Sequence, residues 1–230
     1  GSITSTVSAN TTSGFSIVTF TSPSSASTAY NVGHGLGTTP SLIFKKPTST
    51  TGSWTTHHSS FAANEYIFLD LTNAKGTNTL AWGNTLPSSS LFYGNSGWDG
   101  TSNDYVAYCF SEVKGYSKFG SYKGNGNAGG TFIYTGFKPA FVILKESSAS
   151  GNNWQMFDSV RSPSNEVISR LQANESLAEY NSGNWIDFTS QGFKLRTSAQ
   201  AVNGSGTTYI YMCFAERSLV GTNNVPALAR

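Results

Sequence analysis

The chain contains one peptide pattern twice, and this repeat limits the possible folds more than any other feature. Residues 105–112 (Tyr-Val-Ala-Tyr-Cys-Phe-Ser-Glu) align without a gap with residues 209–216 (Tyr-Ile-Tyr-Met-Cys-Phe-Ala-Glu). Residues 40–46 return in the same way as residues 139–145. The spacing stays close to 100 residues, which is too long for a solenoid, whose units run about 20–50 residues. The repeat therefore predicts a duplicated domain.

The composition favours β-structure. Aromatic residues make up 13% of the chain and charged residues only 11%, less than half of the usual share of about 25%. Serine and threonine are abundant beside the 24 glycines. Short strands of β-branched and aromatic residues joined by small polar turns use this mixture, whereas helices need more Ala, Leu, Glu, Lys and Arg. An all-β fold is predicted.

We predict two tandem, internally duplicated β-sandwich domains. Residues 1–13 are expected to form a linker or connecting strand, residues 14–114 the first sandwich, residues 115–219 the second, and residues 220–230 a C-terminal tail. About seven short strands in each copy is the strand density of a sandwich. A jelly-roll or lectin-like sandwich fits as well as an immunoglobulin-like one.

Local patterns within the copies sharpen this prediction. The repeated segments 105–112 and 209–216 are apolar on both faces, so each should be a central strand covered on both sides. Residues 166–177 alternate in a way that fits either a strand or a short helix. Residues 202–206 (Val-Asn-Gly-Ser-Gly) read as a hairpin turn.

The charge and hydropathy patterns exclude two kinds of partner. The net charge is +2 and no run of Lys or Arg occurs, so no nucleic-acid partner is expected. No apolar stretch approaches the roughly 20 residues that cross a bilayer, so membrane insertion is not expected either. The N-terminus has neither a signal peptide nor an initiator methionine, which indicates a piece of a longer polypeptide or a cleaved chain.

Glycine and histidine motifs give little support for a cofactor or metal. Residues 124–129 match a dinucleotide-binding string, but a strand-like segment follows instead of the helix that such a site needs, so a turn is predicted. His57 and His58 are adjacent on a predicted strand and point to opposite faces. His34 lies in a Gly-His-Gly loop without a second ligand nearby in sequence.

Acidic residues also show no duplicated chemistry. Asp99 and Asp104 bracket a polar loop that leaves a single calcium site open as an alternative, although the matching residues 202–206 contain no acid. No nucleophile elbow occurs, and no carboxylate pair recurs as a duplicated glycosidase site would require. We therefore predict no catalytic residue, no metal, no cofactor and no enzymatic activity.

The two cysteines occupy the same phase of equivalent strands. If each copy has its own core, the thiols of Cys109 and Cys213 lie too far apart for a disulfide. Each is predicted to be a small buried hydrophobe.

Tryptophans outside the repeat-matched core positions are the candidate binding residues. Trp82, Trp98 and Trp185 fall in or beside stretches where the two copies differ most, which we interpret as loops. Aromatic residues on loops are frequent in carbohydrate and protein contacts, although some simply cover the ends of a sandwich. We predict that these three indoles are at least partly exposed and contribute to ligand binding.

Several motifs occur in a fixed order along most of the chain. They are residues 14–18 (Gly-Phe-Ser-Ile-Val), 32–37 (Val-Gly-His-Gly-Leu-Gly), 105–112, 115–122 (Gly-Tyr-Ser-Lys-Phe-Gly-Ser-Tyr), 134–141 (Tyr-Thr-Gly-Phe-Lys-Pro-Ala-Phe) and 192–196 (Gly-Phe-Lys-Leu-Arg). Together they resemble a domain family of unassigned function found in large structural, tail-fibre-like proteins of marine tailed bacteriophages. The resemblance extends from about residue 14 to residue 219.

The resemblance implies a virion structural protein located on the tail or capsid surface. A tail-fibre or tail-tip module for host attachment is the first expectation, and a capsid decoration or head-fibre protein is the alternative. A glycan-degrading enzyme is a lesser alternative. Other virion proteins and further copies of the chain are the expected partners, because phage fibres usually act as oligomers, and a host-surface glycan or protein is a further one. Repeated weak sites gain avidity when they are presented together.

Overall fold

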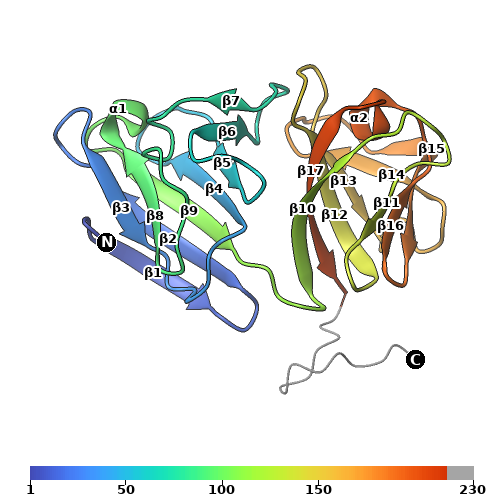
Figure 1. Ribbon diagram of the computed structural model, residues 1–230, viewed down its shortest axis with the longest axis horizontal. Helices are drawn as coiled ribbons and strands as arrows, with labels where there is room; N and C mark the ends of the chain where they lie inside the picture. The colour runs from blue at the N-terminus through green and yellow to red at the C-terminus, as the bar shows by residue number, and fades with distance from the viewer. Residues whose placement is uncertain (217–230) are drawn as a thin grey trace. The chain divides into compact units, whose positions relative to one another are not determined.

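The structure is a computed structural model that describes residues 1–216 (Figure 1). It confirms the all-β prediction, with 44% of residues in strands and 4% in helices. The chain divides into two compact units, one of residues 1–71 and 75–112, the other of residues 72–74 and the described residues from 113 onward. The predicted tail at residues 220–230 lies outside the described residues. Within residues 1–216, no helix has the length and apolar character needed to span a membrane.

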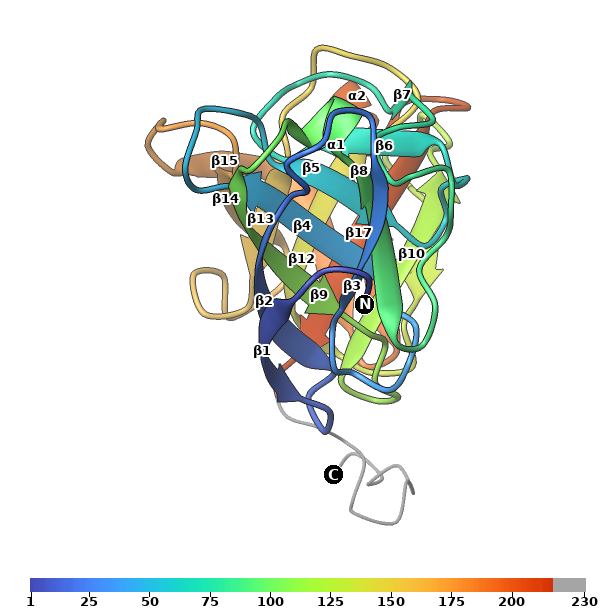
Figure 2. The same ribbon diagram turned by 90° about the vertical axis from the view of Figure 1, so that its left-hand side faces the viewer.

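The first unit contains one large antiparallel sheet and one small one (Figure 2). The seven-stranded sheet has the order β1 (Ser5–Asn10), β2 (Phe15–Thr21), β9 (Asp104–Phe110), β4 (Leu42–Pro47), β5 (Thr55–His58), β6 (Glu65–Phe68) and β7 (Gly76–Thr77). The small sheet pairs β3 (Ala29–Gly33) with β8 (Leu91–Asn95). Residues 1–13, expected to be a linker or connecting strand, contribute β1 as the edge strand of the large sheet.

The two sheets of the first unit share one hydrophobic core. Strand β2 alternates buried and exposed residues, so Val18 and Phe20 point to the same side, as the two-residue period of a strand requires. Cys109 of β9 packs with them. Val32 of β3 and Phe92 of β8 complete the same cluster from the small sheet, and both are fully buried.

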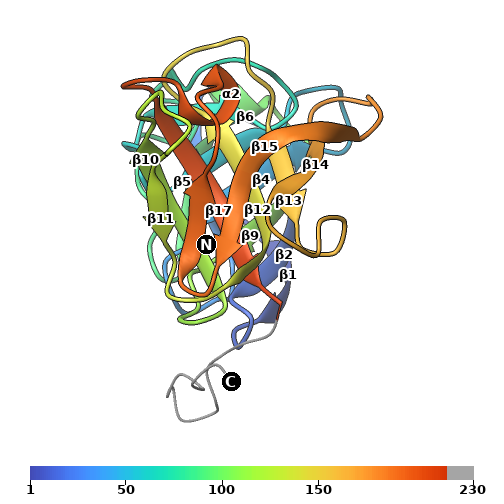
Figure 3. The ribbon, with the colours of Figure 1, turned by 90° about the vertical axis from the view of Figure 1, so that its right-hand side faces the viewer.

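The second unit forms one eight-stranded sheet instead of two separate sheets. Its order is β10 (Ser117–Lys123), β17 (Thr208–Ala215), β12 (Pro139–Glu146), β13 (Gln155–Asp158), β14 (Val167–Gln172), β15 (Tyr180–Thr189), β16 (Gly192–Leu195) and β11 (Phe132–Tyr134). Strand β14 bonds to both β13 and β15, with a register shift between Val167 and Ser169. This continuous pairing curls the sheet toward a closed barrel (Figure 3).

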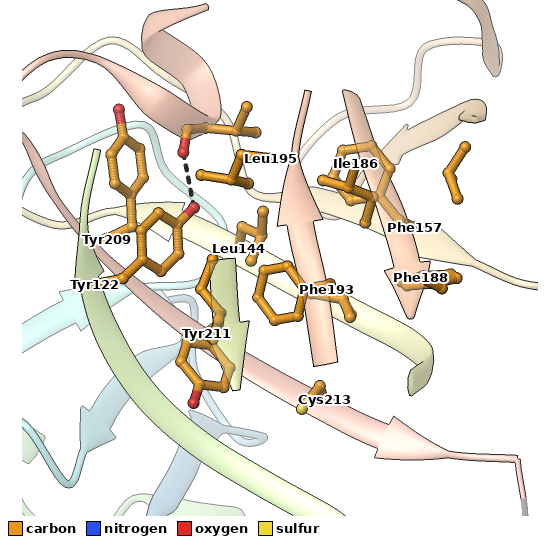
Figure 4. Packing of buried hydrophobic residues seen from close by; sticks show 14 of the residues in the cluster. Tyr122, Leu144, Phe157, Ile186, Phe188, Phe193, Leu195, Tyr209, Tyr211 and Cys213 are labelled. Carbon is orange, nitrogen blue, oxygen red and sulfur yellow. Dashed lines mark hydrogen bonds between the residues drawn. The ribbon is translucent and has the colours of Figure 1, made fainter. Parts of the chain in front are cut away.

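Aromatic rings fill the core of the second unit (Figure 4). Tyr122 stacks on Tyr209 with ring centroids 5.0 Å apart and planes 14° from parallel. The buried Tyr122 hydroxyl donates a hydrogen bond to the Val202 carbonyl oxygen at 2.8 Å. Phe193 lies edge-on to Tyr211. A buried phenol needs such a partner, because an unpaired hydroxyl in an apolar core is costly.

The repeated apolar segments form the central strands that the sequence predicts. Strand β9 lies between β2 and β4, and β17 lies between β10 and β12. In the first unit Cys109 is opposite Ile43, and in the second Cys213 is opposite Val142. Complete coverage of both faces was predicted wrongly for both strands, since residues 106, 108 and 110 of β9 and residues 212 and 214 of β17 are only half-buried. Both cysteines are free and buried, as predicted.

Two short helices stand where the sequence predicts loops or a turn. Helix α1 (Ser96–Asp99) begins after Asn95, whose side-chain oxygen accepts a hydrogen bond from the Gly97 amide at 2.8 Å. Asparagine is a preferred residue at this capping position. Helix α2 (Gln200–Asn203) overlaps the segment 202–206 that was interpreted as a hairpin turn. Residues 166–177, for which strand and helix both fitted, contain strand β14.

Residues 124–129 form a loop between β10 and β11, as predicted, and open no helix. Asn203 holds this loop: its side-chain oxygen accepts the Asn125 amide at 2.9 Å, and its amide group donates to the Asn127 carbonyl at 2.9 Å. The glycine string is therefore a structural turn anchored by a buried asparagine.

His57 is buried in the core of the first unit. It lies opposite Ile43 in the sheet and edge-on to the Trp82 ring at 5.7 Å. Burial, with a smaller effect of the neighbouring His58, lowers the pKa of His57 from 6.5 to about 3. The imidazole is therefore neutral in the folded protein at pH 7. The second unit has Phe157 at the equivalent position, opposite Val142.

The lowered pKa predicts acid sensitivity that His57→Phe should reduce. The pKa of His57 is lower in the folded than in the unfolded protein, so protons bind the unfolded chain first as the pH falls. The unfolding free energy is therefore undiminished above pH 6.5 and decreases as the pH falls toward 3. At pH 5 the wild type should lose about 2 kcal/mol of unfolding free energy through this residue. Urea denaturation at pH 7 and pH 5 measures the difference. If the unfolding free energy of His57→Phe depended on pH as strongly as that of the wild type, the lowered pKa of His57 would be wrong.

Candidate functional site

The structure places the three candidate tryptophans in very different surroundings. Trp82 is only 1% exposed, so the prediction of a surface indole is wrong there. Its ring packs against the Lys45 amine at 4.7 Å and belongs to the core of the first unit. Trp98 lies in helix α1 and Trp185 in strand β15, so neither is in a loop as predicted, but both are partly exposed.

Trp98 lies at a pocket of about 390 Å³ in the first unit. The walls come from the β4–β5 loop, from Phe68 of β6, and from α1 with the turn that follows it. The lining residues are Pro47, Thr50, Thr51, Gly52, Ser53, Thr55, Phe68, Trp98, Asp99, Gly100, Asn103 and Tyr105. This volume is at the lower end of the range of small-molecule sites, about 300–1,000 Å³.

Aromatic contacts hold the Trp98 ring in place. The planes of Trp98 and Phe68 are 8° from parallel, with centroids 6.3 Å apart. Tyr66 packs on Trp98 at 4.7 Å with a tilt of 58°. Gly100 follows the helix with φ of 74°, a conformation that favours glycine and that turns the chain back toward β9. Tyr66 and Phe68 therefore hold the indole of Trp98 in place.

A buried ion pair lies beneath this wall. Lys45 Nζ is 2.6 Å from Asp99 Oδ1, and both side chains are 1% exposed. The Tyr30 hydroxyl donates to Asp99 Oδ2 at 2.5 Å. The Tyr105 hydroxyl donates to the Asp99 carbonyl oxygen at 2.6 Å, and Lys45 also donates to the Ala81 carbonyl oxygen at 3.3 Å. Both carboxylate oxygens of Asp99 thus have partners.

The electrostatics of the cluster keep both phenols neutral. Burial, with the nearby Asp99 charge, raises the pKa of Tyr30 well above its ordinary value. Burial and the same charge also raise the pKa of Tyr105. A neutral phenol keeps the proton that it donates to Asp99, so each tyrosine acts as a fixed donor. The arrangement positions α1 and its tryptophan; it does not prepare a proton for transfer.

The second unit fills the corresponding position with side chains. The strand registers pair Pro47 with Tyr105 and Glu146 with Tyr209, so Glu146 stands at the position of Pro47. Asn152, in the β12–β13 loop, donates to Glu146 Oε2, and Gln200 of α2 donates to Glu146 Oε1 at 2.5 Å. Glu146 is fully buried. In the first unit Pro47 has no polar side-chain atom to accept such a bridge and lines the pocket, while the neighbouring Lys46 donates from Nζ to the Gly52 carbonyl oxygen.

Trp185 belongs to a different surface, in the second unit. The Arg170 guanidinium lies 3.9 Å from the Trp185 ring centroid and 4.6 Å from that of Tyr180. Arg170 also donates to Gln155 Oε1 at 3.1 Å, and the indole N–H donates to the Ser182 carbonyl oxygen at 2.8 Å. Cation–π contacts of this kind contribute about 0.5–1 kcal/mol at exposed sites. They fix the indole against Arg170.

Residues considered for metal binding have other partners. His34 is fully buried: its Nε2 contacts the Ser88 carbonyl oxygen at 3.2 Å and its Nδ1 accepts the Leu36 amide at 3.3 Å. Burial lowers its pKa, although the Ser88 contact opposes this effect. Asp104 accepts the Thr21 hydroxyl at 2.7 Å. Within residues 1–216, no three His, Cys, Asp or Glu side chains group together as a metal site would need.

Sequence reasoning missed Phe68, Asn103 and the loop residues of the pocket. Phe68 alternates with the buried Ile67 in β6, which signals an outward ring. Asn95 followed by Ser-Gly-Trp-Asp could have shown the helix start, since asparagine caps helices. No local sequence pattern predicts that β6, α1 and the β4–β5 loop meet at one pocket, because these segments are far apart in the sequence.

The fold and pocket define an all-β protein of two antiparallel units, the first with an aromatic-walled pocket above a buried ion pair. Residues 1–218 match the family described as "Domain of unknown function (DUF7483)", and the chain belongs to this family. Comparisons with curated proteins and with solved structures gave no match.

The second unit suggests a matched test of the ion pair. By register Leu144 corresponds to Lys45, and Asn203 ends α2 as Asp99 ends α1. Lys45→Leu leaves a buried carboxylate without its cation and should cost about 3–5 kcal/mol. Adding Asp99→Asn should restore at least half of that loss. Hydrogen exchange of the β4 amides measures the stability of the first unit. Equal destabilisation by the single and double variants would contradict this account.

Proposed function

We propose that this chain is a structural module of a tailed-bacteriophage virion, in a tail fibre or tail tip, that contributes to host-surface attachment. The observation that carries the attachment role is the pocket at Trp98, a supported aromatic wall at the surface of a rigid β unit. The ordered motifs that resemble marine phage structural proteins support the virion context. Binding residues on a rigid scaffold are the usual design of recognition modules.

The proposal includes a finer description of the fold, a tandem duplication of a jelly-roll or lectin-like sandwich. Equivalent hydrogen bonds support it. The Trp54 amide donates to Asp70 Oδ1 at 3.0 Å, and the Trp154 amide donates to Asn174 Oδ1 at 2.8 Å. The strand order β2-β9-β4-β5-β6 also matches β10-β17-β12-β13-β14. In this interpretation, β15 joins strands of the second unit whose counterparts lie in two separate sheets of the first unit.

The proposed module acts by binding and not by catalysis. Asp99 is the acid that lines the pocket, and its carboxylate oxygens are already engaged by Lys45 and Tyr30. A general acid or base needs an oxygen within reach of the substrate proton. The alternative of a glycan-degrading enzyme predicts new reducing ends when the chain is incubated with host polysaccharide. Sustained turnover that is lost on mutation of one acid would replace the binding proposal.

Attachment predicts that the purified chain competes with its phage for the host. Excess protein should lower the rate of phage adsorption to host cells, and antibodies against the chain should label the tail of intact particles. The Trp98→Ala variant should compete less than Trp185→Ala, since only the first removes a pocket wall. Labelling restricted to the head would favour the alternative of a capsid decoration or head-fibre protein. No labelling of the particle would contradict both.

The proposed partners are other virion proteins and further copies of the chain, and the proposal includes neither nucleic acid nor membrane insertion. Multivalent presentation raises the avidity of weak sites by about 10²–10⁴. We expect the parent polypeptide to be oligomeric, although the isolated chain can be monomeric. Light scattering of a longer piece of the parent protein checks this, and a strict monomer would contradict it.

A further inference from the structure

We infer that the pocket of the first unit binds one or two uncharged sugar rings, with Trp98 as the stacking surface. This inference rests on the proposed attachment function and names its ligand class. Three properties of the pocket carry it: its size, its lack of free charge, and the combination of an aromatic wall with a hydroxyl-rich rim.

The size suits a short segment of a glycan. At about 390 Å³, the pocket is too small to enclose a long oligomer and is large enough for a small ligand. The aromatic wall of Trp98 and Phe68 offers an apolar plane to the C–H face of a pyranose. Large rigid aromatic surfaces give contact area at little cost in conformational entropy.

The charge state of the pocket selects an uncharged ligand. Among the lining residues, all of which belong to residues 1–216, Asp99 is the one that carries a formal charge. Lys45 pairs with that charge at 2.6 Å, and Tyr30 donates to its second oxygen. No cation is among the lining residues, although Lys46 Nζ donates to the carbonyl oxygen of the lining residue Gly52. An acidic glycan would therefore have to draw Lys46 away from Gly52 to gain a cationic partner, and would otherwise meet an uncompensated desolvation cost.

The polar part of the lining matches hydroxyl groups. Thr50, Thr51, Ser53 and Thr55 supply hydroxyls that can both donate and accept. Asn103 donates from its amide nitrogen to the Asp99 carbonyl oxygen at 2.9 Å, which orients its side-chain oxygen as an acceptor. Ligand hydroxyls can pair with these groups without a change in the backbone.

The second unit provides a natural comparison. Its β12–β13 loop places Asn152 two residues before Trp154, where the first unit has Gly52 two residues before Trp54. Asn152 and Gln200 bridge to the buried Glu146, and α2 carries the fully buried Val202 at the position of Trp98. The first unit thus has Gly52 and Pro47 where the second has the hydrogen-bonded Asn152 and Glu146, and it has Trp98 where the second has Val202. The inferred sugar site therefore lies in the first unit.

The test uses the whole chain and defined sugars. The probes are the methyl glycosides of glucose, galactose and mannose and N-acetylglucosamine, with glucuronic and galacturonic acid as charged probes. At least one uncharged sugar should shift the amide signals of Gly52, Gly100 and Asn103 and the Trp98 indole signal in the wild type. Trp98→Ala should weaken its binding at least about tenfold, or about 1.4 kcal/mol. Trp185→Ala, the matched control in the second unit, should change it less than about twofold.

The amide and indole signals of the wild type test sugar binding even if the Trp98→Ala variant does not fold. No shift at the pocket with any uncharged probe would overturn the inference, as would tighter binding of a uronic acid or equal affinity in a folded Trp98→Ala variant. The proposed function fails separately. If sugars bind at the pocket but the chain does not compete for phage adsorption, attachment is wrong. If the chain competes for adsorption and no sugar binds, only the ligand class is wrong.

Discussion

Each unit depends on hydrogen bonding to both edges of its last strand. Strand β9 bonds to β2 and β4, and β17 bonds to β10 and β12, so a segment near the end of each unit joins strands from its beginning and middle. The paired strands are far apart in the sequence, so pairing them costs the entropy of closing a long loop. Burial of apolar side chains must offset this cost. Ala107, Cys109 and Cys213 supply small, fully buried side chains on these strands. The remaining strands extend the sheets outward from this centre.

A second constraint distinguishes the first unit from the second. Lys45 lies on a buried strand where the second unit has Leu144, and it needs Asp99 because an isolated buried ammonium is very costly. Asp99 in turn is held by Tyr30 and contributes its backbone carbonyl to Tyr105. The pair therefore locks α1 against the sheet. A core requirement thereby positions Trp98 at the surface.

The candidate site follows from this difference between the units. Helix α1 and α2 occupy corresponding positions, but α2 turns Val202 into its core while α1 presents Trp98 beside Phe68. In the second unit, Asn152 and Gln200 both donate hydrogen bonds to Glu146. In the first unit, Pro47 stands at the position of Glu146 and lines the pocket. The position is thus bridged by side chains in the second unit, whereas in the first unit it borders a pocket.

The sequence by itself determined the all-β class, the centrality of the repeated segments 105–112 and 209–216, and the buried free cysteines, since these follow from composition and local alternation. It also picked out Trp98 and Trp185 as partly exposed. Only the tertiary structure decided that Trp82 is buried beside Lys45, that β15 joins the second unit into one sheet, and that Phe68, Trp98 and Asn103 share a pocket. Local patterns specify strands because they act over a few residues, whereas exposure depends on which distant segments pack together.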